Sequence, residues 1–242
     1  MVKIILLILS LISTVTVHLL ANTLPINNQT NGDILNRLPV FFTPANYVFS
    51  IWIVIYMLLA CWIWNSIREY RSIQQLPMKR VLLFMVACIL NIASILIWHY
   101  ELFNISFIMI VALLGTLFSL YMTYSINEQN WMSRLPISIY IGWIFIVTFV
   151  NLDYLLTYHE FSGLGITKSL WTVIFLTVAT AIALHFRYHY EDRAIVIVFI
   201  WAFLGIACRH QFNELLITTA SLFLSSVLVA GILFIKKTPS KQ

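Results

Sequence analysis

The segment ISIYIGWIFIVTFVNLDYLL, residues 137–156, determines the fold class of this chain. It is apolar over the roughly 20 residues that an α-helix needs to cross the hydrocarbon core of a bilayer. Within it, Tyr140, Trp143 and Asn151 recur at helical spacing, so they share one face of the predicted helix. An amide in lipid is costly unless another helix or a ligand satisfies it. This face is therefore expected to point into a helix bundle or a pocket.

The composition of the whole chain is typical of a membrane protein. Hydrophobic residues make up 61% of it and charged residues only 10%, whereas soluble domains carry about 25% charged residues. We predict an all-α polytopic membrane helix bundle with about eight transmembrane helices. The segment 194–208 is shorter than a usual span, so it is expected to be tilted, buried or re-entrant. The eight apolar segments are residues 4–21, 47–64, 81–98, 105–124, 137–156, 170–186, 194–208 and 215–235.

The distribution of basic residues predicts the orientation of the chain. Of its 14 Lys and Arg residues, an eight-span topology places only Arg37, Lys168 and Arg209 on one side of the membrane. Because cytoplasmic loops are rich in Lys and Arg, the opposite side, with both termini, is expected to be cytoplasmic. No soluble nucleic-acid-binding motif accompanies these charges, so nucleic acid is not an expected partner. The cytoplasmic set is Lys3, Arg68, Arg71, Lys79, Arg80, Arg134, Arg187, Arg193, Lys236, Lys237 and Lys241.

The longest loop, residues 22–46, lies on the non-cytoplasmic side in this topology. It contains Pro25, Pro39 and Pro44, and its prolines and Asn-Gly pair are turn-forming. A loop of this length without periodicity is often a lid or a binding loop. A partly ordered connector would have the same composition, so both interpretations stay open.

Three of the predicted helices each carry a tryptophan and a polar group on one face. Aromatic walls with a few convergent polar groups are typical of pockets for flat, largely apolar ligands. Two simpler explanations compete: Tyr and Trp near span ends form interfacial belts, and amides bond neighbouring helices together. Tyr56 and Trp143 lie near the middle of their spans, where a belt does not explain them. The pairs are Trp52 with Tyr56, Asn91 with Trp98, and Trp143 with Asn151.

These motifs resemble the tryptophan-rich sensory protein family, the bacterial relatives of the mitochondrial translocator protein (TspO/MBR family). Tyr47 stands where the family usually has tryptophan, and Ile139 stands where it has proline before Tyr140. The matching motifs are Pro44…Tyr47-Val48-Phe49…Trp52…Tyr56, then Leu90-Asn91 with Trp98-His99-Tyr100, then Tyr140, Trp143 and Asn151.

The resemblance implies a domain organisation and a site. Residues 1–157 would form a five-helix core with a pocket beneath the loop 22–46, and residues 158–242 a three-helix membrane extension. Asp153 is a candidate for proton or ion coupling. No catalytic constellation is recognisable, so an enzyme is the less favoured hypothesis. A stacking pocket is favoured over iron ligation, so no metal site is predicted. The implied ligand-binding residues are Tyr47, Trp52, Tyr56, Asn91, Trp98, Tyr140, Trp143 and Asn151.

The implied function is that of an integral membrane receptor or sensor in a bacterial cytoplasmic membrane. Its expected partners are membrane lipid and a flat hydrophobic ligand such as a porphyrin or haem, with no cofactor required. A secondary transporter of a small hydrophobic or anionic solute is the alternative. Small residues in the last segment permit close helix contacts within the chain or between copies, so a homo-oligomer stays a hypothesis. They are Ala220, Ser221, Ser225, Ser226, Ala230 and Gly231.

Overall fold

The computed structural model of the chain describes residues 2–73, 76–125 and 131–235. Within these ranges the protein is all-helical, and eight of its helices are long and apolar enough to cross a membrane. The all-α bundle with eight candidate spans is thus confirmed. The elements are α1 (Val2–Thr23), α2 (Asn31–Arg37), the 3-10 helix η1 (Asn46–Ser50), α3 (Ile51–Ile73), α4 (Met78–His99), α5 (Phe103–Tyr121), α6 (Trp131–Tyr158), η2 (Gly163–Gly165), α7 (Lys168–Tyr190), α8 (Arg193–His210) and α9 (Leu215–Phe234).

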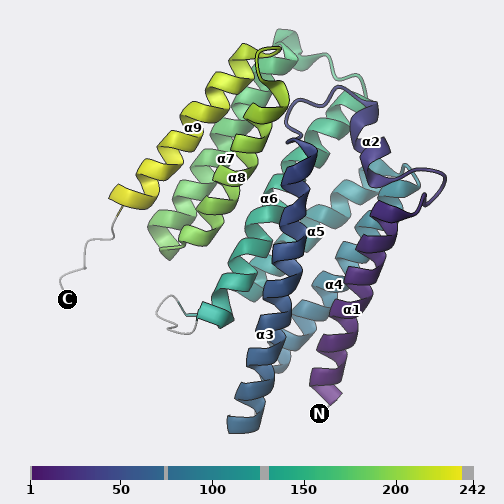
Figure 1. Cartoon of the computed structure of the whole chain (residues 1–242), viewed down its shortest axis with the longest axis vertical. Coiled ribbons are helices and arrows are strands. Elements are labelled where there is room, and N and C mark those ends of the chain that lie inside the picture. Colours follow the sequence, from purple (N-terminus) through teal and green to yellow (C-terminus); the bar gives the residue numbers. More distant parts are fainter. Residues whose placement is uncertain (1, 74–75, 126–130, 236–242) are drawn as a thin grey trace.

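The long helices form two groups that meet at α6 (Figure 1). One group contains α1, α3, α4, α5 and α6, and the other contains α7, α8 and α9. Helix α6 packs against α3 and α5 on one side and against α8 on the other, and 61% of the residues in its most apolar 18-residue stretch are buried. Gly142 permits close contact with α8, because an added Cβ would lie 3.3 Å from the Ile195 Cα. The helix on which the fold prediction rested is therefore the central one.

The outward faces of the long helices are strongly apolar. Ile53 on α3, Ile108 on α5 and Phe223 on α9 are each more than 60% exposed. Such side chains are costly in water but stable in lipid, so these faces fit a hydrocarbon environment.

Helix α8 contains the short segment 194–208, and more than half of it is buried, in agreement with one of the three alternatives expected for this segment. The helix runs for 18 residues from Arg193 to His210, because its polar ends continue the apolar segment 194–208. The Asp192 carboxylate caps its first turn by accepting hydrogen bonds from the backbone N–H groups of Ala194 and Ile195, at 2.9 and 3.1 Å. Three basic residues of the orientation argument, Lys236, Lys237 and Lys241, lie outside the described residues.

The structure also shows where the long loop 22–46 and the small residues of α9 lie. The loop contains a short helix, α2, which lies across the end of the core group opposite the start of α1 (Figure 1). On α9, Ser221, Ser225 and Gly231 are buried within the chain. An added Cβ at Gly231 would lie 2.5 Å from Leu184 of α7, so this glycine serves packing between α7 and α9.

A buried polar network joins the two groups at the end where α7 leads into α8. The Asp192 carboxylate accepts hydrogen bonds from the Tyr121 hydroxyl of α5 at 2.9 Å and from Ser138 of α6 at 2.6 Å. Arg134 of α6 lies 3.5 Å from the same carboxylate and donates to the Tyr190 carbonyl at 2.7 Å. Because both charged side chains are largely buried, their mutual contact compensates for lost hydration.

Candidate ligand-binding site

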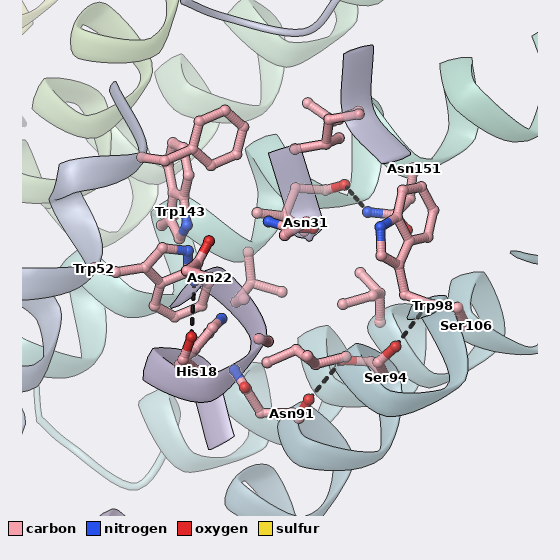
Figure 2. A pocket seen from close by; sticks show the side chains of 18 residues that line it. His18, Asn22, Asn31, Trp52, Asn91, Ser94, Trp98, Ser106, Trp143 and Asn151 are labelled. Carbon is pink, nitrogen blue, oxygen red and sulfur yellow. Dashed lines mark hydrogen bonds between the residues drawn. The ribbon is translucent and has the colours of Figure 1, made fainter. Parts of the chain in front are cut away.

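A cavity of about 80 Å³ lies inside the core group, between α1, α3, α4, α5 and α6 and beneath α2 (Figure 2). Its wall is mainly apolar and aromatic, with polar groups from several helices. Its lining residues are His18, Ala21, Asn22, Asn31, Leu35, Phe49, Trp52, Asn91, Ser94, Ile95, Trp98, Ser106, Ile110, Trp143, Ile144, Val147, Val150 and Asn151.

Helix α6 contributes Trp143, Val147 and Asn151, and two of these, Trp143 and Asn151, belong to the helix face predicted from the sequence. The indole of Trp143 is fully buried and contacts Phe49 and Trp52 edge-on, with ring centroids 5.6 and 6.3 Å apart. The Asn151 amide donates to the Val147 carbonyl of its own helix at 2.9 Å. That bond does not join α6 to a neighbouring helix, so the interpretation of Asn151 as a link between helices is not supported by it.

Asn91 lines the cavity from α4 and connects it to a residue that lies behind the wall. Its amide donates a hydrogen bond to the Tyr140 hydroxyl at 2.8 Å, and both side chains are buried. Tyr140 itself is not among the lining residues. The three residues predicted to share one face of α6 therefore differ in their contacts: Trp143 and Asn151 line the cavity, whereas Tyr140 accepts a hydrogen bond from Asn91 behind the wall.

Replacing Tyr140 with phenylalanine is expected to lower the free energy of unfolding by about 1 kcal/mol, because the Asn91 amide loses its buried acceptor. Unfolding in mixed detergent micelles, followed by circular dichroism, measures this. Tyr188→Phe is the matched control, since Tyr188 is 54% exposed. Equal losses in the two variants would show that the Asn91–Tyr140 bond contributes nothing.

Two tryptophans that line the cavity carry buried indole N–H groups. Trp98 and Trp143 are both buried, and neither Nε1 has a hydrogen-bond partner within the described ranges. The Asn91 side-chain oxygen is likewise unpaired there. Buried polar atoms are normally satisfied, so two donors and one acceptor in a cavity wall indicate that water or a ligand completes them.

Two predicted residues lie away from this cavity. Tyr47 is 49% exposed and packs edge-on against Trp201 of α8, with ring centroids 5.6 Å apart. Asp153 lines a separate cavity near Lys168, and its carboxylate accepts the Phe42 backbone N–H at 2.9 Å. The structure thus brings Trp52, Asn91, Trp98, Trp143 and Asn151 together in the cavity wall and leaves Tyr47, Tyr56, Tyr140 and Asp153 outside it.

The ligand-binding residues predicted from the sequence do not include His18, Asn22, Asn31 and Phe49, which also line the cavity. His18 lies in the wall, hydrogen-bonded to the Tyr56 hydroxyl, with its ring centroid 4.2 Å from that of Trp52. His18 and Asn22 are four residues apart on α1, and the Asn22 amide donates to the His18 carbonyl at 2.8 Å. This pair of polar residues, one helical turn apart in an otherwise apolar helix, is the sequence feature that could have placed α1 in the cavity wall.

A groove of about 420 Å³ between α1 and α3 adjoins the cavity. Leu19 and Ile53 border it, and both are about 60% exposed on the apolar outer surface. Tyr56 lines the groove, where its ring stacks on Trp52. The cavity therefore adjoins a side opening toward the lipid. The two spaces share His18, Asn22, Asn31, Leu35, Phe49 and Trp52.

Helix α2 is the roof of the cavity, to which it contributes Asn31 and Leu35. A capping box begins it: the Asp33 backbone N–H donates to the Thr30 hydroxyl at 3.3 Å, and the Thr30 backbone N–H donates to the Asp33 carboxylate at 2.8 Å. The Thr30 hydroxyl also donates to the Asp33 carboxylate at 2.7 Å, and this hydrogen bond, followed by that of the Thr30 backbone N–H, lowers the pKa of Asp33. A helix this short is marginal alone, so its position depends on contacts at its ends.

One such contact is a cluster around Glu101, in the turn between α4 and α5. Gln29 donates to the Glu101 carboxylate at 2.7 Å and Arg37 at 3.0 Å. The hydrogen bond from Gln29 and, to a smaller extent, the one from Arg37 lower the pKa of Glu101. The hydrogen bond between Arg37 and Glu101 also raises the pKa of Arg37. Asn27 also donates to the His99 carbonyl at 3.0 Å. The roof is thus fixed to the α4–α5 turn by Gln29, which precedes α2, and by Arg37, its last residue.

Because the pKa of Glu101 is depressed, its contribution to the stability of the roof is present at neutral pH and is lost as the pH falls below about 4. Glu101→Gln is expected to increase hydrogen exchange in residues 31–37 several-fold at pH 7, and wild type should approach that rate, after correction for intrinsic exchange, under acid. Glu160→Gln, in another exposed turn, is the control. Identical protection in Glu101→Gln and wild type would contradict the role of this cluster.

Among the residues that the structure describes, no three His, Cys, Asp or Glu side chains form a group that could hold a metal ion. Among the described residues of the cavity wall, His18 is the one titratable side chain. The wall is therefore suited to stacking, apolar contact and neutral hydrogen bonding.

The chain matches the family described as TSPO-like protein over residues 4–234. No curated protein and no solved structure matches it. The family match includes all eight long helices, so it extends over α7–α9 as well as the core group. Together, the match and the eight apolar helices make this an integral multi-pass membrane protein. The chain belongs to the TSPO-like protein family.

Proposed function

We propose that this protein is a membrane receptor or sensor that binds a flat, hydrophobic, tetrapyrrole-like ligand in the cavity and the adjoining groove. The observation that carries the proposal is the convergence of Trp52, Trp98 and Trp143, from three different helices, on one space. Aromatic faces supply large contact area and favour flat ring systems by stacking.

The size of the site limits how such a ligand would bind. A single water requires about 10–15 Å³ of comparable volume, so a cavity of about 80 Å³ holds several waters but not a tetrapyrrole. The groove adds about 420 Å³ and shares one wall with the cavity. A ligand of this class would occupy both spaces, with His18 and Trp52 moving aside at the shared wall.

The polar groups of the wall agree with a ring system that carries both donors and acceptors. The Nε1 atoms of Trp98 and Trp143 would donate to such a ligand, and the Asn91 side-chain oxygen would accept from it. None of the described lining residues is Lys or Arg. Ionised substituents would therefore remain at the mouth of the groove, because a buried unpaired carboxylate is costly.

We also propose that the protein lies in a bacterial cytoplasmic membrane with both termini in the cytoplasm. The basic residues Arg68, Arg80 and Arg134 are at the end of the bundle where α1 begins, and α2 lies at the opposite end. The ligand would then reach the site from the outer leaflet or the outer aqueous phase.

Titration of the purified protein in detergent with protoporphyrin IX tests the proposal. Saturable quenching of tryptophan fluorescence, at micromolar concentration or below, is expected because the ring would lie beside three tryptophans. Non-saturating quenching equal to that of empty micelles would contradict it. Flux of the ligand across proteoliposomes, reduced in Asp153→Asn, would instead favour the transporter hypothesis.

A further inference from the structure

The loop between α2 and α3 is fixed to α8, a helix of the C-terminal group. The Ala45 backbone N–H donates to the Gly205 carbonyl at 3.1 Å, and the Trp201 indole donates to the Val48 carbonyl at 3.2 Å. Gly205 makes this approach possible, since an added Cβ would lie 2.1 Å from a Val48 methyl group. The loop therefore rests directly on the α8 backbone.

The last turn of α8 makes further contacts with the same loop. Arg209 donates to the Pro44 carbonyl at 3.4 Å and to the Asn36 side chain, within the roof itself, at 3.2 Å. His210 donates from Nε2 to the Phe41 carbonyl at 2.7 Å. Arg209 is thus a direct connection between α8 and α2.

Helix α8 is itself held firmly. It packs closely on α6 at Gly142, and its first turn is capped by Asp192 within the buried network that joins the two helix groups. The loop between α2 and α3 is also anchored by buried side chains, since Phe42 and Val48 are fully buried and Phe42 contacts Phe149 and Phe175. The short helix α2, in contrast, is joined to α8 by the Arg209 hydrogen bond near the bundle end, which water can replace. Low-stability segments of this kind are the ones that open.

We propose that Arg209 and His210 are positioning residues of the ligand site: they hold the loop on α8 so that α2 stays closed over the cavity. Neither residue lines the cavity. This inference rests on the proposed function, and it gives the C-terminal group a role in ligand exchange. The Glu101 cluster holds the roof to the α4–α5 turn through Gln29 and Arg37, and Arg209 holds it to α8 through Asn36, so loss of Arg209 leaves the roof without its hydrogen bond to α8.

Two measurements on Arg209→Ala test the proposal, and the first requires no ligand. Hydrogen exchange in residues 31–37 is expected to increase about tenfold, while protection of α6 is unchanged. Dissociation of protoporphyrin IX, followed by stopped flow with apoprotein acceptor in excess, is expected to accelerate about tenfold. Because the roof hinders both directions, association should accelerate too, and the Kd should change less than the dissociation rate.

Controls separate this role from a general structural one. Arg193→Ala removes an exposed arginine at the other end of α8 and is expected to change neither rate. Arg209→Lys should restore part of the protection. If Arg209→Ala folds poorly, Asn36→Ala removes the exposed acceptor of the same contact and should reproduce the faster exchange.

The outcomes distinguish this proposal from the proposed function. If wild type does not bind protoporphyrin IX but Arg209→Ala still loses roof protection, the positioning role stands and the ligand class is wrong. If wild type binds and Arg209→Ala changes neither roof exchange nor dissociation, the positioning role is wrong. A change in the Kd of Arg209→Ala without a change in the hydrogen exchange of residues 31–37 would likewise overturn it.

Discussion

Replacing Trp143 with alanine is expected to raise the Kd for protoporphyrin IX about 30-fold or more. Trp143 is fully buried and contacts both Phe49 and Trp52, so its removal deletes one aromatic wall and releases the two rings beside it. Loss of a buried aromatic anchor typically costs about 2 kcal/mol of binding free energy, which is about 30-fold in affinity.

The controls for this experiment lie in the same chain. Trp64→Ala removes a tryptophan that is 62% exposed on α3 and should leave the Kd unchanged. Trp143→Phe keeps an aromatic ring but loses the unpaired Nε1, so an intermediate effect is expected. An equal Kd for wild type and Trp143→Ala, measured on protein with native helix content, would place the ligand elsewhere.

Replacing Asp192 with alanine is expected to lower the free energy of unfolding by about 3–5 kcal/mol. The substitution leaves Arg134 as a largely buried charge without its partner, and breaking one side of a buried pair costs about that amount. It also removes the acceptor of Tyr121 and Ser138 and the cap of α8. The two helix groups should therefore lose their connection at this end.

Unfolding in mixed micelles measures this loss. Asp192→Asn should be less harmful, since an amide oxygen can still cap α8, and Glu191→Gln at the neighbouring exposed position should be neutral. A loss of less than about 1 kcal/mol in Asp192→Ala would show that the network contributes little to the joining of the two groups.

The parts of this structure that the sequence predicts are those that depend on local pattern. Eight apolar segments predict eight spans because hydropathy over about 20 residues decides membrane insertion. The helical spacing of Trp143 and Asn151 predicts a shared face, and both line the cavity. The match of the chain to the TSPO-like family confirms the resemblance that these residues suggested.

The remaining features depend on contacts between distant segments. Helix α6 is buried on most sides, so the sequence of its polar face does not reveal whether that face lines a cavity or packs on another helix. Tyr140, for example, was predicted to line the site but is hydrogen-bonded to Asn91 of α4. Tyr47 has the position of a family motif residue but packs on Trp201, which follows 154 residues later in α8, a helix that the motif does not include. The interaction of Arg209 with Asn36 joins segments separated by 173 residues. No local periodicity encodes such a contact.

The most direct test of the central claim is fluorine NMR of protein labelled with fluorotryptophan at its eight tryptophans. Addition of protoporphyrin IX is predicted to shift the resonances of Trp52, Trp98 and Trp143, each assigned by a Trp→Phe variant. Trp62, whose indole donates to Tyr124 at 2.7 Å outside the cavity, and the exposed Trp64 should not shift. Shifts confined to Trp62 and Trp64, or no shift at a saturating concentration, would contradict a tetrapyrrole site among the three cavity tryptophans.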